Sequence, residues 1–144
     1  MRSLLDVNFI IALLDPDHVF HDQSHSWWAD NSNSGWASCP LTENGVVRIM
    51  SNPNYSGKIR FSPTHLINRL QMFAAQTDHE FWPDEVSLLD DSVFVADRIH
   101  GSRQLTDIYL LALAVRHFGR LVTFDQSIPL TAVIGAGPDN LCLA

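Results

Sequence analysis

The chain has 144 residues, 46% of them hydrophobic, and a formal net charge of −7. This length and hydrophobic content exclude a disordered chain and are enough for a core without disulfides, so we expect one domain over residues 1–144. The negative charge argues against a nucleic-acid binder, because phosphate affinity normally requires a basic face. That argument fails only if some of the acids form a metal site, where a bound cation reverses the local charge.

Cysteine content and apolar runs predict the compartment. Cys39 and Cys142 are too few for a disulfide framework, and neither belongs to a C-x-x-C pair, so a reducing cytoplasm is expected. Few apolar residues separate Met1 from Asp6, so we expect no secretory signal. No run approaches the roughly 18 apolar residues of a membrane span.

The first elements in chain order are a strand and two helices. RSLL (2–5) predicts a short buried strand that ends at Asp6, and VNFIIALL (7–14) predicts a helix with apolar residues on most of its faces. Asp15-Pro16-Asp17 is a turn pattern. Asp17 is the expected N-cap of a second helix that runs through Trp27 and Trp28.

The middle of the chain predicts two strands and two helices. GWASCP (35–40) reads as a strand, and LTENGVVRIMSN (41–52) as a helix with Thr42 as its N-cap. Ser62-Pro63 is a strong helix start, because a cap is followed by proline at the first helical position. Apolar residues recur at helical spacing after it, and form either core or a groove for a partner peptide: Leu66, Ile67, Leu70 and Phe73. HEFW (79–82) predicts the third strand.

In the last third of the chain, predicted helices and strands continue to alternate. DSVFVADRIH (91–100) and TDIYLLALAVRHF (106–118) predict helices closed by Gly101 and Gly119. RLVTFD (120–125) predicts a fourth strand, and NLCLA (140–144) is a candidate fifth. Strands that alternate with helices predict an α/β/α sandwich around a mainly parallel sheet of four to five strands.

Four carboxylates fall where this fold places its sites. Ligands bind outside the carboxyl ends of parallel strands, and the helices that follow begin at the same edge. Asp6 and Asp125 end predicted strands, whereas Glu43 and Asp107 lie in the first turns of predicted helices. We therefore expect the four to gather. Each taken alone has a structural reading, as a first-turn acid favoured by the helix dipole or as a cap of a turn.

Gathered carboxylates require a cation. Two of them about 4–5 Å apart repel by roughly 3–4 kcal/mol at an effective dielectric constant near 20. A divalent metal removes this penalty, and all-oxygen ligation favours Mg²⁺ or Mn²⁺. Such a site activates water and polarises a phosphoryl oxygen, so the predicted reaction is metal-assisted phosphodiester hydrolysis.

The motifs around these acids resemble those of a known family. LLDVNFIIALL around Asp6, LTENGVVRIM around Glu43, TDIYLLALAV around Asp107 and LVTFD around Asp125 resemble the acidic signatures of PIN domains, and most closely those of VapC toxins. The resemblance extends over nearly the whole chain. GSRQLTDIYLLALAV together with LVTFD is its most specific part, whereas D-x-N before apolar residues is weak by itself.

The resemblance implies a Mg²⁺- or Mn²⁺-dependent endoribonuclease, the toxin of a type II pair, which is silenced by a cognate VapB-type antitoxin and is often dimeric. Asp6, Glu43 and Asp107 would be the principal acids, and Asp125 would complete the cluster directly or through water. Asn8 would support the metal shell. Thr123, two residues from Asp125 on one strand, would point to the same side and support it too.

The number of cations limits how RNA is held. Lys58 is the one lysine, and Arg48, Arg60 and Arg103 are the candidate RNA-binding residues. The segment 52–61, NPNYSGKIRF, is either a mobile loop that touches RNA or antitoxin, or an exposed connector.

Other features have competing interpretations. His18, His21 and His25 would share one helical stripe, which is either a zinc site or, as we favour, an ordinary helix face. The tryptophans could stack on bases, but core or dimer packing is favoured; they are Trp27, Trp28, Trp36 and Trp82.

Rival functions remain at this point. The alternative to a nuclease is a catalytically silent PIN-like scaffold that binds a partner protein or RNA. A response-regulator receiver requires a late lysine, which is missing after Lys58. A haloacid-dehalogenase-type phosphatase requires D-x-D, and the second position here is Asn8.

Overall fold

One parallel sheet organises the protein. The computed structural model describes residues 1–144, and its five strands lie in the order β3-β2-β1-β4-β5, with every neighbouring pair parallel. The strands are β1 (Ser3–Leu5), β2 (Trp36–Ser38), β3 (His79–Phe81), β4 (Arg120–Thr123) and β5 (Leu141–Leu143). Because all five are parallel, their carboxyl ends share one edge. The five predicted strands are confirmed.

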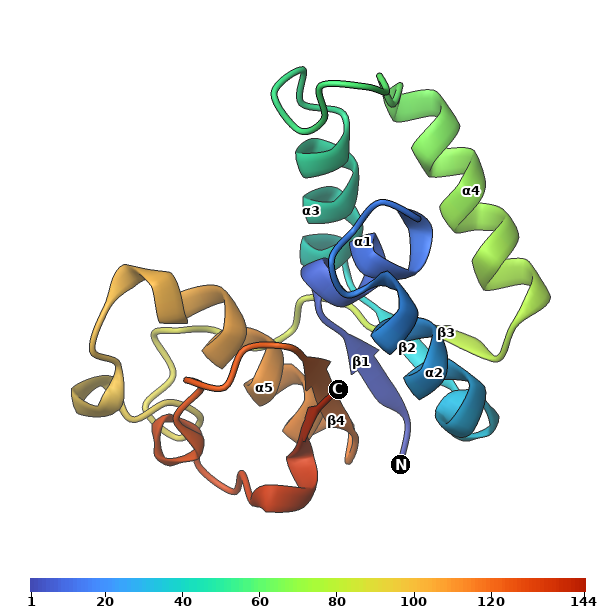
Figure 1. Cartoon of the computed structure of the whole chain (residues 1–144). Coiled ribbons are helices and arrows are strands. Elements are labelled where there is room, and N and C mark those ends of the chain that lie inside the picture. Colours follow the sequence, from blue (N-terminus) through green and yellow to red (C-terminus); the bar gives the residue numbers. More distant parts are fainter.

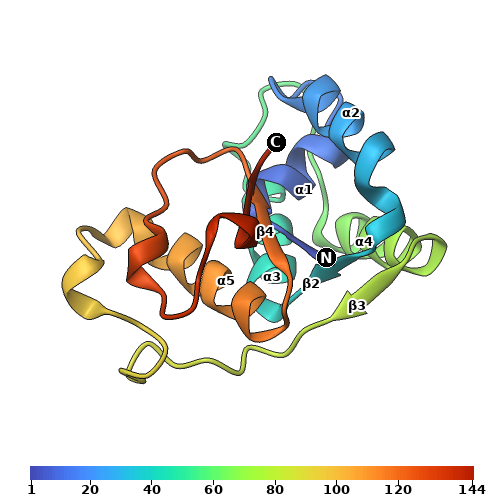
Figure 2. The same cartoon turned by 90° about the horizontal axis from the view of Figure 1, so that it is seen from below.

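Helices cover both faces of the sheet, so the predicted α/β/α sandwich is confirmed (Figures 1 and 2). The α-helices are α1 (Val7–Leu14), α2 (His21–Asn31), α3 (Pro40–Met50), α4 (Pro63–Gln76) and α5 (Leu105–Arg116). α5 lies on one side of β1 and β4, and the other four helices lie on the opposite side. No helix is both long and apolar enough to cross a membrane.

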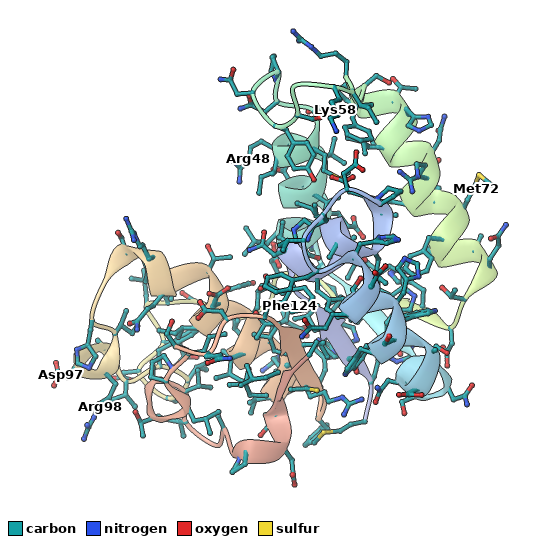
Figure 3. The ribbon with its side chains drawn as sticks, viewed as in Figure 1. Arg48, Lys58, Met72, Asp97, Arg98 and Phe124 are labelled. Atoms are coloured by element: carbon teal, nitrogen blue, oxygen red, sulfur yellow. The ribbon has the colours of Figure 1, made fainter.

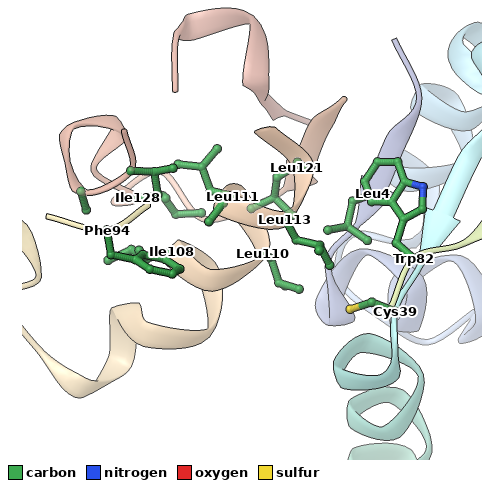
Figure 4. Packing of buried hydrophobic residues seen from close by; sticks show 14 of the residues in the cluster. Leu4, Cys39, Trp82, Phe94, Ile108, Leu110, Leu111, Leu113, Leu121 and Ile128 are labelled. Atoms are coloured by element: carbon green, nitrogen blue, oxygen red, sulfur yellow. The ribbon is translucent and has the colours of Figure 1, made fainter. Parts of the chain in front are cut away.

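Alternation along the strands divides the core into two clusters. Leu4 and Leu121 point toward α5, whereas Leu5 and Val122 point toward α1 and α3. Figure 4 shows the cluster around α5, in which Trp82 packs near Leu4 and Cys39. Burial on both faces explains why the central strands read as continuous apolar runs.

Two predicted helix starts are wrong. α2 begins at His21 with Phe20 at its N-cap, not after Asp17, because residues 15–20 form a further turn in which Asp15 accepts hydrogen bonds from the backbone of Asp17 and His18. In α3 the N-cap is Cys39. Thr42 is the third helical residue, and its hydroxyl accepts a hydrogen bond from the Cys39 backbone N–H at 3.0 Å. Ser62, in contrast, caps α4 as predicted.

The predicted helix over 91–100 is also wrong. This segment holds only a short 3₁₀ turn, Ala96–Arg98. Phe94 instead forms an antiparallel bridge with Val133, supported by hydrogen bonds from Val95 N to Ala132 O and from Ile134 N to Val93 O. Long-range backbone pairing therefore replaced the local helical bonds that the apolar spacing suggested.

α5 ends at Arg116, two residues before the predicted end at Phe118. Phe118, not Gly119, takes the left-handed conformation after the helix, with φ of 55°. The backbone N–H groups of Phe118 and Gly119 donate to Val115 O and Ala114 O, which completes a Schellman motif. Gly119 is required for a different reason: a Cβ there would lie 2.7 Å from the Arg2 carbonyl oxygen.

Candidate active site

Asp6 is the most deeply buried of the predicted acids, at 5% exposure. It follows β1 and caps α1, where its Oδ1 accepts a hydrogen bond of 2.7 Å from the Val7 backbone N–H. Its Oδ2 accepts from Thr123 Oγ1 at 2.8 Å. Both carboxylate oxygens are therefore held at the carboxyl edge of the sheet.

Asp107 and Asp125 lie close enough to Asp6 for their charges to interact. Asp107 is in the first turn of α5, and Asp125 follows β4. The Asp125 backbone N–H donates to Thr123 Oγ1 at 3.0 Å, and its Oδ1 accepts from the backbone and hydroxyl of Ser127 at 2.8 and 2.7 Å. Thr123 thus contacts two of the acids.

The electrostatics of the three aspartates are those of a crowded negative site. Burial raises the pKa of Asp107 to about 7, and repulsion from Asp6 and a hydrogen bond with Asp125 add to this effect. Burial also raises the pKa of Asp6, although the bonds from Thr123 and Val7 oppose the change. The bonds from Ser127 lower the pKa of Asp125. Near neutral pH Asp107 is therefore partly protonated.

Glu43 belongs to the same edge of the sheet but bonds elsewhere. α3 packs directly on α1, where a Cβ at Gly45 would lie 2.8 Å from Val7 Cγ2. The Glu43 Oε2 accepts a hydrogen bond of 2.5 Å from Ser38 Oγ. No hydrogen bond joins Glu43 to the three aspartates, and no three His, Cys, Asp or Glu side chains converge closely enough to hold one ion.

Ser38 connects Glu43 to a histidine that the sequence did not single out. Ser38 is 3% exposed, and its Oγ also lies 2.7 Å from His79 Nε2. Because the hydroxyl hydrogen goes to Glu43, the histidine Nε2–H is the donor in the second contact. Burial lowers the pKa of His79, which favours this neutral ring. Side chains alternate between the two faces of a strand, so Ser38 faces α3, and this alternation in the sequence would have identified it.

Asn8 makes no contact with the acids. It is exposed in the first turn of α1, and no hydrogen bond connects its side chain to another residue. Its predicted support of a metal shell stays a prediction.

The chemistry of the aspartates fits a hard divalent cation. All the available donors are carboxylate oxygens, and the raised pKa values of Asp6 and Asp107 reflect negative charge that burial leaves uncompensated. A bound dication would lower both pKa values and displace the proton from Asp107.

A pocket of about 550 Å³ lies between α3 and α4 and reaches Glu43. Ser38 and His79 form its polar end, whereas Val47, Ile67 and Leu70 contribute apolar wall. Of the predicted apolar stripe on α4, Leu66 is buried in the core and Ile67 is 45% exposed. The stripe is therefore shared between core and pocket.

The cations divide into engaged and free groups. Four of the nine donate hydrogen bonds or form ion pairs within the protein: Arg2, Arg69, Arg116 and Arg120. The other five are exposed and form neither: Arg48, Lys58, Arg60, Arg98 and Arg103. In Figure 3, Arg48 and Lys58 lie on the α3 side of the molecule and Arg98 on the far side, with Phe124 between them.

The histidines expected on one stripe have a structural role. His18 lies before α2 and does not share its face. His21 Nδ1 contacts Ala12 O at 2.7 Å and His25 Nε2 contacts Leu13 O at 2.9 Å. The two rings therefore cap the carboxyl end of α1. Of the tryptophans, Trp36 and Trp82 are buried in the core.

Comparison with known proteins finds close relatives along the whole chain. Ribonuclease VapC44 of Mycobacterium tuberculosis is 51% identical over 141 residues, which cover 98% of each chain. Ribonuclease VapC39 of the same species is 42% identical over 135 residues, covering 94% of this chain and 96% of the relative. No protein-family model matches.

A solved structure has the same fold. The crystal structure of VapBC2 from Rickettsia felis, bound to a DNA fragment from their promoter, matches 100% of this chain and 98% of that chain with a TM-score of 0.52. The sequence identity is 14%, so the likeness concerns the fold.

Proposed function

Because this chain belongs to the VapC ribonucleases, the toxins of VapBC pairs, we propose that it is a PIN-type endoribonuclease that hydrolyses RNA phosphodiester bonds with Mg²⁺ or Mn²⁺. The observation that carries this proposal is that three aspartates at one edge of the sheet shift one another's pKa values. They follow β1, lie in the first turn of α5 and follow β4. Buried carboxylates that repel one another are stable together when a cation compensates them.

Asp6, Asp107 and Asp125 are the proposed metal-holding residues, with Glu43 as the fourth acid. When bound, the metal supplies an activated water and stabilises charge on the phosphoryl group. Thr123 orients the Asp6 carboxylate, and Ser127 orients that of Asp125. Asp107, whose pKa is raised to about 7, would be the residue that loses a proton if a cation were held there.

The free cations provide the proposed grip on the RNA backbone. Arg48 and Arg60, with Lys58, lie on and beyond α3, whereas Arg103 lies just before α5. The first group follows β2 and the second precedes β4, strands on either side of β1, whose carboxyl end carries Asp6 at the acid edge of the sheet. An RNA strand that contacts both groups would cross that edge.

The pocket between α3 and α4 is the proposed site for an apolar segment of a VapB-type antitoxin. Its walls are mainly aliphatic, and Glu43 at its polar end would attract a cationic side chain. A guest in this pocket would lie beside the acids and obstruct RNA.

Homodimer formation is a further part of the proposal, and sedimentation velocity measures it directly.

Purified protein and labelled RNA test the nuclease proposal. We expect cleavage that requires Mn²⁺ or Mg²⁺, stops with EDTA and is lost in Asp107→Asn. Asp97→Asn is the matched control, because Asp97 is exposed in a 3₁₀ turn away from the acids. If wild-type protein cleaves equally well in EDTA, the metal assignment is wrong.

One observation favours the scaffold alternative: no three ligand side chains converge as the protein stands. Calorimetry with Mn²⁺ separates the two functions. A nuclease site should bind Mn²⁺ and lose this binding in Asp6→Asn, whereas a silent scaffold should show no heat of binding in either protein.

A further inference from the structure

Three phenylalanine rings form a ladder from the core to the surface. Phe9 is fully buried and stacks on Phe124, with ring centroids 5.4 Å apart and an interplanar angle of 29°. Phe124 stacks in turn on Phe20, at 4.5 Å and 24°. Phe20 is 38% exposed, so the outermost ring of the ladder reaches solvent.

The inner rings of the ladder are attached to the acid site. Phe124 lies between Thr123, which bonds to Asp6, and Asp125. Phe9 is in the α1 turn that Asp6 begins. Figure 3 places Phe124 near the centre of the molecule, below the α1 region. The Phe20 ring is therefore connected to the segment that carries the carboxylates through two ring contacts.

We propose that Phe20, supported by Phe124, is a stacking platform for one base of the RNA next to the cleaved phosphodiester. This inference rests on the proposed ribonuclease function. The ligand is an unpaired base, because a duplex hides the faces of its bases, whereas single strands offer them to aromatic side chains.

The charge of the protein favours stacking over further phosphate contacts. The chain carries 16 acidic side chains against nine lysines and arginines. The acid edge adds local negative charge, and five cations are free to hold phosphates. Stacking on a neutral ring is not opposed by this charge. It therefore provides affinity close to the carboxylates, where the phosphate backbone is repelled.

The Phe20 side chain is only partly covered by its neighbours, at 38% exposure. Its ring neighbours are Phe124 and His18, and the His18 ring lies at 5.9 Å and is tilted by 41°. Val19 beside it is 85% exposed and packs against nothing in the core. A second copy of the chain is the other occupant to consider, and the sedimentation coefficient distinguishes it from RNA.

The experiment measures binding of a short fluorescein-labelled single-stranded RNA of randomised sequence, by anisotropy, in an Asp107→Asn background that prevents cleavage. We expect Phe20→Ala to weaken binding about 5- to 150-fold, the range typical of base–aromatic stacking. Phe20→Tyr and Phe20→Trp should retain affinity. Phe20→Leu should lose it as Ala does, because it keeps the apolar volume without a ring. Val19→Ala is the control and should bind as the parent.

An abasic ribose-phosphate oligomer of the same length isolates the stacking contribution. It carries the same charges, so Phe20→Ala should leave its affinity unchanged. Equal binding of RNA by Phe20→Ala and the parent overturns the platform, as does full affinity in Phe20→Leu. A change of sedimentation coefficient with unaltered RNA binding assigns Phe20 to contact between copies, which also overturns it.

Failure of the nuclease proposal has a different result. In that case wild-type protein does not cleave RNA under any metal condition, whatever effect Phe20→Ala has on binding. Circular dichroism and thermal unfolding identify any variant that does not fold. If Phe20→Ala does not fold, the RNA affinities of Phe20→Tyr and Phe20→Leu are compared instead.

Discussion

Thr123 Oγ1 donates a hydrogen bond of 2.8 Å to Asp6 Oδ2, which joins residues 117 positions apart in the sequence. The same oxygen accepts from the Asp125 backbone N–H at 3.0 Å. Parallel pairing of β1 with β4, in which Leu5 is opposite Val122, brings these groups together. One buried hydroxyl therefore fixes the position of two acids.

Replacement of this hydroxyl should damage the site more than the fold. We expect Thr123→Val to cost about 1–3 kcal/mol in unfolding free energy, because Asp6 loses a buried donor. Mn²⁺ affinity should fall about 10- to 100-fold, as when outer-shell partners of a metal are removed. Thr123→Ser keeps the hydroxyl and should retain most of the affinity. Urea denaturation and calorimetry measure both effects, and unchanged Mn²⁺ affinity in Thr123→Val would contradict the role.

Stability of the metal-free protein should depend on pH through Asp107. Its pKa is raised to about 7 from 3.8, so the folded state holds a proton that the unfolded chain releases. The contribution of Asp107 to the free energy of unfolding is therefore highest at acidic pH and declines between about pH 4 and 7. Because the side chain is partly exposed, we expect a loss on the order of 1–2 kcal/mol.

Denaturation in EDTA at pH 5 and pH 8 measures this effect. Asp107→Asn should reduce the decline, and the remaining slope would come from other groups such as Asp6, whose pKa is also raised. Mn²⁺ at pH 8 should restore wild-type stability but not that of the variant. An identical pH dependence in wild type and Asp107→Asn would count against the pKa assignment.

Ser38 should compete with a metal for Glu43. The Ser38 hydroxyl holds the Glu43 carboxylate at 2.5 Å, toward the α3–α4 pocket. Removal of this bond by Ser38→Ala should tighten Mn²⁺ binding by about 3- to 10-fold, the equivalent of one net hydrogen bond. In a Glu43→Gln background the same substitution should have no effect. Calorimetric titration of the four proteins gives the coupling, and weaker binding in Ser38→Ala would show that Ser38 positions Glu43 for the metal.

Gly45 should be required for the contact between α1 and α3. An added Cβ would lie 2.8 Å from Val7 Cγ2, on a stiff β-branched side chain. Alanine normally gains up to about 1 kcal/mol over glycine within a helix. We nevertheless expect Gly45→Ala to destabilise the protein by about 1–2 kcal/mol through overpacking. The double variant Val7→Ala/Gly45→Ala should be more stable than additivity predicts, and thermal unfolding tests this.

The sequence determined the order of the elements and the position of the acids in that order. Apolar runs of strand length predicted β1, β2 and β4, since burial on both faces leaves a local apolar signature, and the helical spacing after β1 predicted α1. The edge strands β3 and β5, which are more exposed, were predicted as well. Ser62-Pro63 fixed the start of α4 through local backbone chemistry. Parallel topology then placed Asp6, Asp107 and Asp125 at one edge without knowledge of any contact. Their catalytic roles and the metal stay predictions.

The tertiary structure alone decided which partner each group takes. Within the segment 91–100, residues 93–95 pair with 132–134 instead of forming a helix, and Glu43 bonds to Ser38 and not to an aspartate. Phe118 adopts the left-handed conformation in place of a glycine. In each case the competing options differ by about 1 kcal/mol locally. Contacts between segments distant in sequence therefore decide the outcome. A local pattern specifies on which face or end of an element a side chain lies, but not which neighbour it will bond to.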